Sequence, residues 1–454
     1  MRVTVEDMAN CREQRAQTQR EMLAKYSTPL VSFTMNIPGE IKTNPLLQRG
    51  FALAEDAILR RLEGAGFHPL EARYTRAFTG WEMLCAVPGD ALAIKKALCP
   101  LEEADAFGRL LDIDIIRLDG GKVSREDVGM PPRSCLLCGQ AAAVCGRSRA
   151  HLAQELFNRV EDIVREKVTL SIARQVGETA QWALLTEAAI TPKPGLVDCD
   201  NTGAHQDMDL HTFLASAAAL RPYFEQCAQV GAMMAGDGAQ QCMPRIRALG
   251  LLAQDNMLQA TGGVNTHMGA IYGLGILCCA AGRVLEREGT LTADTLLKTA
   301  GEIAARETDS LKALAAQGTA TGGVRQYVLY GLTGARGQAA EGFPAVRDIG
   351  LPVLTQSLNE GLSLNDAGVY ALLALMEQVH DSNLIRRGGM EKQQELMEQV
   401  RKMRKEKPAL ETVRGLDVQL IRDNLSPGGS ADLLAFTLFV YRARGFRGWT
   451  PSPL

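Results

Sequence analysis

The spacing of apolar and polar residues predicts a mixture of strands and helices at the start of the chain. Residues 29–38 (PLVSFTMNIP) alternate between apolar and polar side chains, and a period of two with β-branched and aromatic residues predicts a half-buried strand. Residues 46–62 carry apolar positions at helical spacing and end at glycines. Residues 74–87 have the pattern of a strand or hairpin, and 110–118 form a β-rich run closed by a turn signal. These elements indicate an α/β domain.

After about residue 165 the pattern becomes helical. Ala-rich segments with helical spacing recur and strand patterns are nearly absent, while Gly- and Pro-rich loops with many polar residues join the segments. We therefore predict an α/β domain over 1–165 and an all-α domain over 166–454, with the site of the second domain on its loops. The predicted helical segments are 178–190, 209–221, 266–286, 292–316, 364–379, 390–404 and 429–443.

Composition narrows the class of protein without choosing a function. The 454 residues suggest two or three domains of ~150 residues each. A net charge of −3, from 49 basic and 52 acidic side chains, argues against nucleic-acid binding as the main task. No uninterrupted apolar run approaches the ~18 residues that cross a membrane, and the start of the chain lacks the apolar stretch of a signal peptide. Eleven scattered cysteines indicate reduced thiols and a cytoplasmic location.

Asp112 and Asp114 are the first candidate for chemistry. They lie one residue apart in the predicted strand 110–118, so their side chains project from the same face. Neighbouring carboxylates repel unless a cation lies between them, and Mg²⁺ takes carboxylates together with phosphate oxygens. Arg109, just before the strand, could pair with a phosphate. The pair fits a magnesium-triphosphate site for pyrophosphate displacement; the alternative is an exposed strand face with two solvated aspartates.

A possible metal site of another kind follows. The pattern C-x2-C-x6-C-x5-H is formed by Cys135, Cys138, Cys145 and His151. Thiolates and imidazole are the ligands of tetrahedral Zn²⁺, so zinc binding is one prediction. The alternative is a set of buried free cysteines beside a basic loop.

Five loops between the predicted helices concentrate polar groups. The first, 192–209, carries Lys193 with Asp198 and Asp207, two carboxylates that could chelate Mg²⁺ or form turns. The other loops carry Asn265 and His267 at a predicted helix start, Arg336, Asp381 with Arg387, and Asp432. Helix starts bind anions, and Lys and Arg pair with phosphates. Together the loops predict a phosphate-rich substrate held by Mg²⁺, lysine and arginine.

The same loops carry a resemblance to a known family. The triphosphoribosyl-dephospho-CoA synthase family has a motif set similar to KPGLVD…NTGAHQDMD, GVNTHMGAI, LTGARGQAAEGFP, DSNLIRRGG and NLSPGGSADLL, which run from residue 180 onward. The apo-citrate lyase phosphoribosyl-dephospho-CoA transferase (holo-citrate lyase synthase) family resembles residues 10–160 through REQRAQTQ, PLVSFTMNIPGEIK, GRLLDIDI and PPRSCLLCGQAAAVC. The whole chain resembles a fusion of the two enzymes.

The resemblance implies two consecutive transfers. The helical domain would join ATP to 3′-dephospho-CoA, giving 2′-(5-triphosphoribosyl)-3′-dephospho-CoA and adenine. The first domain, implied to be a nucleotidyltransferase-like mixed sheet, would then move phosphoribosyl-dephospho-CoA onto a serine of the acyl-carrier (gamma) subunit of citrate lyase and release pyrophosphate. Mg²⁺ is the implied cofactor, and we expect neither nucleic acid nor membrane as a partner.

Residues within the matched motifs are the candidates for these roles. The candidate carboxylates for metal binding or proton transfer are Asp198, Asp207, Asp381 and Asp432. The candidate phosphate contacts are Lys193, Arg336 and Arg387, while Asn265 and His267 would orient the substrate or the leaving group. The predicted metal ligands are Asp112, Asp114, Asp198 and Asp207. Further candidates for phosphate or carrier binding are Arg12, Arg15, Lys42, Arg109 and Arg133. Many nucleotidyltransferases have a Gly-Ser pair shortly before the paired aspartates, and this chain has none there, so only the aspartate strand is carried over.

Two other functions stay open. The equivalent maturation of malonate decarboxylase uses the same prosthetic group, although the motifs of the first domain favour citrate lyase. The other is a non-catalytic assembly factor that docks the carrier protein, against which the intact loop carboxylates argue.

Overall fold

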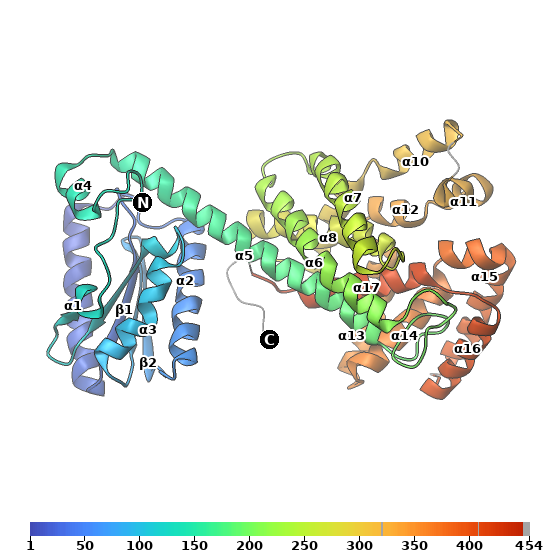
Figure 1. Ribbon diagram of the computed structural model, residues 1–454, viewed down its shortest axis with the longest axis horizontal. Helices are drawn as coiled ribbons and strands as arrows, with labels where there is room; N and C mark the ends of the chain where they lie inside the picture. The colour runs from blue at the N-terminus through green and yellow to red at the C-terminus, as the bar shows by residue number, and fades with distance from the viewer. Residues whose placement is uncertain (319–320, 407, 448–454) are drawn as a thin grey trace. The chain divides into compact units, whose positions relative to one another are not determined.

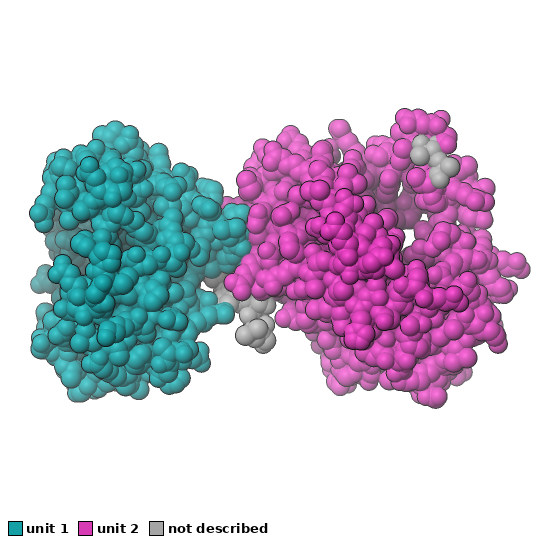
Figure 2. Space-filling view, in the orientation of Figure 1, with its two compact units in different colours: residues 1–171, 449–454 teal, residues 172–448 magenta. Residues whose placement is uncertain are grey.

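The structure is a computed structural model that describes residues 1–318, 321–406 and 408–447. The chain folds into two compact units, shown in Figures 1 and 2, one over residues 1–171 and one over residues 172–447. The division falls inside a single helix, α5 (Ala153–Ala189).

The first unit is a five-stranded sheet with helices on both faces (Figure 1). Its strands are β1 (Leu30–Met35), β2 (Glu71–Ala77), β3 (Gly80–Ala86), β4 (Leu111–Ile116) and β5 (Lys122–Val123). Its helices before α5 are α1 (Val5–Tyr26), α2 (Pro45–Gly64), α3 (Ala91–Glu103) and the short α4 (Ala142–Ser148). The predicted strand at 29–38, helix at 46–62, hairpin at 74–87 and strand at 110–118 correspond to β1, α2, β2 with β3, and β4.

The sheet is antiparallel throughout its described strands, and the mixed sheet implied by the resemblance is wrong. The strand order is β2-β3-β1-β4-β5, and every neighbouring pair is antiparallel. A helix between two strands produces parallel neighbours only when those strands lie side by side. Here α3 connects β3 to β4, and β1 is inserted between them, so the crossover is split.

Alternate residues of β1 separate an apolar face from a partly polar one. Phe33 stacks on Phe51 of α2 with 4.7 Å between ring centroids, and α2 and α3 cover this face. On the other face, the end of α1 closes an apolar cluster formed by Met22, Leu30, Leu84, Ala86 and Ile116. Farther along the same face, Ser32 and Thr34 lie opposite Asp114 and Asp112 of β4. This face therefore changes from a core into a polar surface.

The second unit is helical, as predicted. After α5 its helices are α6 (Leu210–Met233), α7 (Cys242–Ala260), α8 (Met268–Glu288), α9 (Ala293–Ala304), α10 (Glu307–Ala316), α11 (Gly322–Tyr330), α12 (Gly334–Ala340), α13 (Leu351–Asn359), α14 (Leu364–Gln378), α15 (Ser382–Lys405), α16 (Leu410–Arg422) and α17 (Gly428–Ala443). The predicted segment 292–316 is two helices, α9 and α10. By length and composition α8 could cross a membrane, yet 83% of its apolar window is buried, as in the core helix of a globular domain.

Close packing of α6 against α8 forms the centre of this unit. A Cβ atom on Gly282 of α8 would lie 2.0 Å from the Ala228 carbonyl oxygen of α6, and one on Gly231 of α6 would lie 1.9 Å from the Cys279 carbonyl oxygen of α8. Such distances are far inside van der Waals contact, so the two helix backbones approach closely only because both positions are glycine.

We predict that Gly282→Ala destabilises the helical unit by about 1–3 kcal/mol, because the added methyl group must push α6 and α8 apart. The matched control is Gly415→Ala in α16, where a Cβ meets nothing within 4 Å and the substitution stabilises a helix by up to ~1 kcal/mol. Urea unfolding followed by circular dichroism measures both. Equal effects of the two substitutions would contradict the tight α6–α8 contact.

Candidate active sites

A pocket of about 450 Å³ opens over the polar face of the sheet in the first domain. Asp112 and Asp114 both line it, because alternate residues of β4 project from one face. Four cationic side chains line the same pocket: Arg12, Arg15, Lys42 and Lys122. Paired carboxylates beside several cations suit a magnesium-bound polyphosphate.

Each of the two aspartates has one cationic partner. The Lys122 ammonium donates to Asp114 at 2.5 Å, and the Arg133 guanidinium donates to Asp112 at 3.2 Å. Each carboxylate can accept more than one bond, so both keep capacity for a metal ion or substrate. Arg12 makes no hydrogen bond or ion pair with a described residue, which leaves its guanidinium available.

Arg109 lies outside the lining of this pocket. Its guanidinium donates to the Ser134 hydroxyl at 2.6 Å and to the Ser134 carbonyl. Ser134 is followed by the predicted zinc ligands, and the structure brings these together. The sulfur atoms of three cysteines and a ring nitrogen of a histidine lie within 4.8 Å of one another, in Cys135, Cys138, Cys145 and His151. The chain therefore has a Cys₃His cluster, which has the donor atoms of a structural zinc site.

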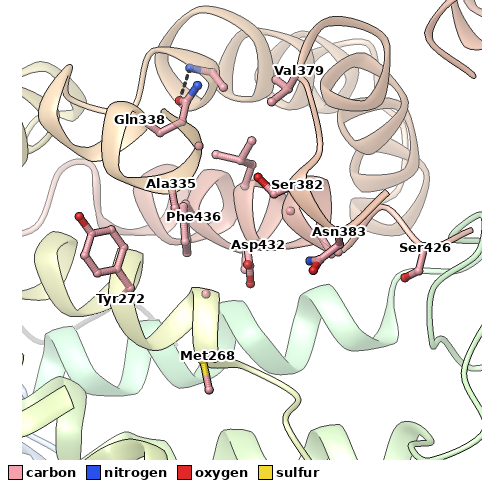
Figure 3. A pocket seen from close by; sticks show the side chains of 18 of the residues that line it. Met268, Tyr272, Ala335, Gln338, Val379, Ser382, Asn383, Ser426, Asp432 and Phe436 are labelled. Atoms are coloured by element: carbon pink, nitrogen blue, oxygen red, sulfur yellow. Dashed lines mark hydrogen bonds between the residues drawn. The ribbon is translucent and has the colours of Figure 1, made fainter. Parts of the chain in front are cut away.

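The second domain contains a cavity of about 1220 Å³ (Figure 3). Residues of the first turns of α6, α8, α12, α15 and α17 lie in its lining, so the amino ends of these helices meet there. Free N–H groups and the helix dipole favour anions at such ends. The volume also exceeds the ~300–1,000 Å³ of an ordinary ligand pocket, which leaves room for two substrates.

Four titratable residues from separate segments interact in this lining: Glu187 of α5, Lys193, His267 and Asp432 of α17. The Lys193 side chain is 1% exposed and donates to Glu187 at 2.6 Å. A buried ammonium and carboxylate are stable only as a pair, so the contact between Lys193 and Glu187 compensates the burial of both groups.

His267 is a neutral donor or acceptor. Its Nδ1 atom lies 2.7 Å from the hydroxyl of Ser216, which is fully buried on α6. Burial, together with the charge of Lys193, lowers the pKa of His267 to about 3. The Nε2 atom of His267 and the hydroxyl of Thr266 are buried without a hydrogen-bond partner among the described residues. Both residues line the cavity, so these two atoms can be satisfied by a bound substrate.

Asp432 points from α17 toward the start of α8, as Figure 3 shows. A Cβ atom on Gly269 would lie 2.0 Å from the Asp432 Oδ2 atom, so the carboxyl group rests against the backbone of α8. Burial, and then the negative charge of Glu187, raise the pKa of Asp432 well above its usual value. The surroundings of Asp432 in the cavity therefore favour the protonated form of its carboxyl group.

Two arginines of α15 also line the cavity and differ in their surroundings. The Arg387 guanidinium donates to the Ala204 carbonyl at 2.8 Å and to the Asn424 side chain at 3.0 Å, so it ties two loops together. Burial, followed by the charge of Arg386, lowers its pKa. Arg386 is exposed and makes no hydrogen bond or ion pair with a described residue, so it is the freer cation.

Three other predicted residues, Asp207, Asn265 and Asp198, differ in whether they line the cavity. Asp207 and Asn265 line the cavity, and Asn265 accepts a hydrogen bond from the Met268 N–H at the start of α8. Asp198 lies outside the lining. Its carboxylate accepts hydrogen bonds from the backbone N–H groups of Lys193, Asp200 and Asn201. Asp198 therefore shapes the loop that presents Lys193, and only Asp207 of the predicted metal pair faces the cavity.

Asp381 and Arg336 also lie outside the lining. Asp381 is 2% exposed and accepts from the N–H groups of Asn383 and Leu384 at the start of α15. Its other oxygen accepts from the backbone N–H and the hydroxyl of Ser430 in α17. One carboxylate thus joins the amino ends of two helices at the cavity. Arg336 has one guanidinium nitrogen buried without a partner among the described residues.

Some residues that line the cavity (Glu187, Arg386) or contact its lining (Ser216, bonded to His267) were not among the predicted ones. Glu187 and Ser216 lie within helices α5 and α6, where a single polar residue in a helical pattern carries no signal of a site. Arg386 neighbours Arg387 in the motif DSNLIRRGG, so the motif pointed to the right segment and the structure identifies the less constrained arginine.

The structure has two units, each with a pocket lined by acidic and cationic side chains, and comparisons with known proteins identify the family. A family model described as ATP:dephospho-CoA triphosphoribosyl transferase matches residues 173–450. A second, described as apo-citrate lyase phosphoribosyl-dephospho-CoA transferase, matches residues 3–167. The chain belongs to the ATP:dephospho-CoA triphosphoribosyl transferase family, fused behind a domain of the apo-citrate lyase transferase family.

Two relatives with one name match nearly the whole chain, and a third matches two thirds of it. The Protein CitXG of Haemophilus influenzae is 34% identical over 98% of this chain and 97% of its own length. The Protein CitXG of Leuconostoc mesenteroides subsp. cremoris is 31% identical over 98% of both chains. A 2-(5''-triphosphoribosyl)-3'-dephosphocoenzyme-A synthase of Haemophilus ducreyi is 36% identical over 67% of this chain and 98% of its own. The predicted fusion of two transferases is confirmed.

We predict that Gly269→Ala lowers adenine release by about tenfold to a hundredfold, because the methyl group displaces the Asp432 carboxyl group and small misplacements of reacting groups are costly. Gly275→Ala is the matched control on the same helix, since its Cβ would lie 2.1 Å from the Tyr223 hydroxyl, away from the cavity lining. Adenine is quantified by chromatography on folded protein. Similar activities of the two variants would contradict the placement of Asp432.

Proposed function

We propose that the cavity of the second domain binds ATP and 3′-dephospho-CoA together and joins them with loss of adenine. The observation that carries this proposal is the position of Asp432, whose pKa is raised by burial, near the buried Glu187–Lys193 ion pair, in a cavity large enough for two substrates and rimmed by helix amino ends. The family assignment supplies the reaction, and these groups match the needs of its chemistry.

The reaction transfers the ribosyl group of ATP between two partners. The 2′ oxygen of dephospho-CoA bonds to C1′ of the ATP ribose, and the bond from C1′ to the adenine nitrogen breaks. The departing adenine takes a proton, for which Asp432 is the proposed donor, and the attacking hydroxyl loses one, for which the Glu187 carboxylate is the proposed acceptor. A carboxylate near C1′ also stabilises the positive charge that develops there. The net change in protons is zero.

The triphosphate of ATP stays attached throughout this step and has to be held. We infer that the helix amino ends and the free Arg386 bind it, with the Nε2 atom of His267 and the Thr266 hydroxyl as further partners. Within the described residues no three carboxylates converge on the cavity. Asp207 would therefore hold Mg²⁺ together with phosphate oxygens, where the ion supplies neutralisation of charge.

Two of the candidate carboxylates, Asp198 and Asp381, would position other groups of the protein rather than contact the substrate. Asp198 and Asp381 have their oxygens occupied by backbone N–H groups. We infer that Asp198 places Lys193 and that Asp381 fixes the amino ends of α15 and α17. Arg387 likewise holds loops, and Arg336 stays a candidate for a phosphate contact through its unpartnered nitrogen.

The first domain is the proposed site of the second transfer. The serine hydroxyl of the acyl-carrier subunit of citrate lyase attacks the phosphorus nearest the ribose, and the bond to pyrophosphate breaks. Asp112 and Asp114 would hold Mg²⁺ on the triphosphate, where it neutralises the departing pyrophosphate. Arg12, Arg15, Lys42 and Lys122 line the same pocket and suit phosphate binding. Arg109 and Arg133 act from the edge of this site through Ser134 and Asp112.

The remaining predictions stay proposals. We assign the transfer to residues 1–165 and the synthesis to residues 166–454, and we expect a cytoplasmic location from the many thiols. We propose that the Cys₃His cluster binds Zn²⁺ because thiolates and imidazole are its preferred ligands. Maturation of malonate decarboxylase is disfavoured by the apo-citrate lyase family match of the first domain. A non-catalytic assembly factor is disfavoured by the intact groups of both sites.

We predict that Asp432→Asn reduces the rate of adenine release by about 10²–10⁴-fold, the usual contribution of a general acid. The unaltered enzyme should also lose activity as the pH rises through the raised pKa of Asp432, because a general acid must carry its proton. This alkaline limb should be absent from the residual activity of the variant. An unchanged pH profile in Asp432→Asn would contradict the assignment of the proton donor.

We predict that Asp112→Asn and Asp114→Asn each reduce transfer to the carrier by about a hundredfold or more, since a metal ion contributes several kcal/mol to such a transition state. Adenine release should stay unchanged because it belongs to the other domain. Asp56→Asn, which removes a carboxylate paired with Arg60 on α2, is the control. Mass spectrometry of the carrier measures transfer; full activity of both variants would exclude the aspartate pair as the metal site.

A further inference from the structure

Residues 131–150 form a segment with no hydrophobic core of their own. Only two of them, Cys135 and Cys145, are buried. The apolar Leu137 and Val144 are 41% and 55% exposed. So short a segment cannot gain order from apolar burial and needs a disulfide or a metal ion instead. The two residues that it does bury both belong to the Cys₃His cluster, and all eleven cysteines are free thiols.

The geometry of the cluster suits a tetrahedral metal. The sulfur atoms of Cys138 and Cys145 are 3.4 Å apart, and the His151 Nε2 atom lies 3.3 Å from the Cys138 sulfur. Ligand atoms around a zinc ion with ~2.3 Å bonds to sulfur are about 3.7 Å apart, so a small expansion accommodates the ion. The backbone N–H of Leu137 also points at the Cys135 sulfur at 3.5 Å, as it would toward a thiolate ligand.

Two arginines connect this segment to the transfer pocket. Arg109, two residues before the start of β4, donates to Ser134, the residue before Cys135. Arg133 donates to the buried Glu102 at 2.7 Å, to the Leu111 carbonyl at 2.9 Å and to Asp112 at 3.2 Å. The guanidinium of Arg133 therefore touches one of the two aspartates in the pocket.

The backbone of Arg133 is fixed by the cluster loop itself. The carbonyl of Arg133 accepts a hydrogen bond from the Ala142 N–H at 2.8 Å. Inside this loop, the Cys135 N–H donates a second bond to the Gln140 carbonyl. The loop that includes Cys135 and Cys138 thus fixes the backbone position of Arg133.

We propose that Zn²⁺ bound by Cys135, Cys138, Cys145 and His151 orders residues 131–151 and thereby holds Arg133 against Asp112, which makes Arg133 a positioning residue of the transfer site. The inference rests on the zinc binding and the transfer reaction proposed above. The metal lies outside the chemistry, and its loss acts through the placement of one guanidinium group. The second domain does not depend on it, so adenine release by the same molecule is an internal control.

The experiment uses the full chain and three variants. Cys138→Ser removes a zinc ligand, Cys138→His replaces it with another zinc ligand, and Cys199→Ser removes an exposed thiol of the second domain as a control for zinc content and carrier transfer. Zinc per chain is measured by mass spectrometry of the metal. Tryptic cleavage at Arg147 and Arg149 reports the order of the segment. Transfer is measured with the preformed triphosphoribosyl intermediate and apo carrier, and adenine release is measured separately.

We expect one zinc per chain in the unaltered protein, in Cys138→His and in Cys199→Ser. Cys138→Ser should lose the zinc, be cut faster by trypsin and transfer about tenfold to a hundredfold more slowly, the usual range for residues that orient a metal site. Its adenine release should be unchanged. Arg133→Ala should reproduce the loss of transfer while keeping the zinc and the resistance to trypsin.

Four results would overturn the proposal, at three different steps. Absence of zinc from the unaltered protein would contradict the proposed metal site. Loss of zinc in Cys138→Ser with normal transfer removes the positioning role, as does normal transfer by Arg133→Ala. If the unaltered chain holds zinc and resists trypsin but never modifies the carrier, the proposed transfer reaction is wrong. The role of Arg133 is then wrong as well, but the metal site is still supported.

Discussion

Convergence of helix amino ends on one cavity is the constraint on which the second domain depends. Each such end leaves backbone N–H groups without a partner inside its helix. Asp381 supplies acceptors for α15 and α17 at once, and Asp198 does the same for the turn that carries Lys193. Because these carboxylates lie outside the cavity lining and satisfy backbone groups there, other helix ends are left for the phosphates of the proposed substrate.

The two domains handle the same triphosphate in different ways, and their sites differ accordingly. In the first reaction the triphosphate is carried along unbroken, and the groups that change bonds need a proton donor and a proton acceptor. In the proposed mechanism Asp432 and Glu187 are this pair, and burial together with the charge of Glu187 raises the pKa of Asp432, as a proton donor requires. In the second reaction a phosphorus–oxygen bond breaks, and two adjacent aspartates beside several cations suit a metal-bound leaving group.

The sequence was most informative where a local pattern determines the geometry. The alternation along β4 predicted that Asp112 and Asp114 share a face, and the cysteine spacing predicted the Cys₃His cluster. The antiparallel sheet escaped prediction because it depends on β1 inserting between β3 and β4, a tertiary event. In the loops, composition showed where carboxylates are concentrated but did not distinguish their roles. Asp381 and Asp198 accept hydrogen bonds from backbone N–H groups, whereas Asp432 lines the cavity. Ser216 has its partner, His267, in a distant segment, and Glu187 meets Lys193 only because the chain turns back beyond the end of α5.

The central claim is that the second domain is a ribosyl-transferring synthase with its chemistry in one two-substrate cavity. The most direct test mixes the purified chain with ATP, Mg²⁺ and 3′-dephospho-CoA and follows free adenine. We predict adenine in a one-to-one ratio with a product heavier than dephospho-CoA by the triphosphoribosyl group, and no adenine when dephospho-CoA is left out. Adenine released without dephospho-CoA, or none from folded protein with all three present, would contradict it.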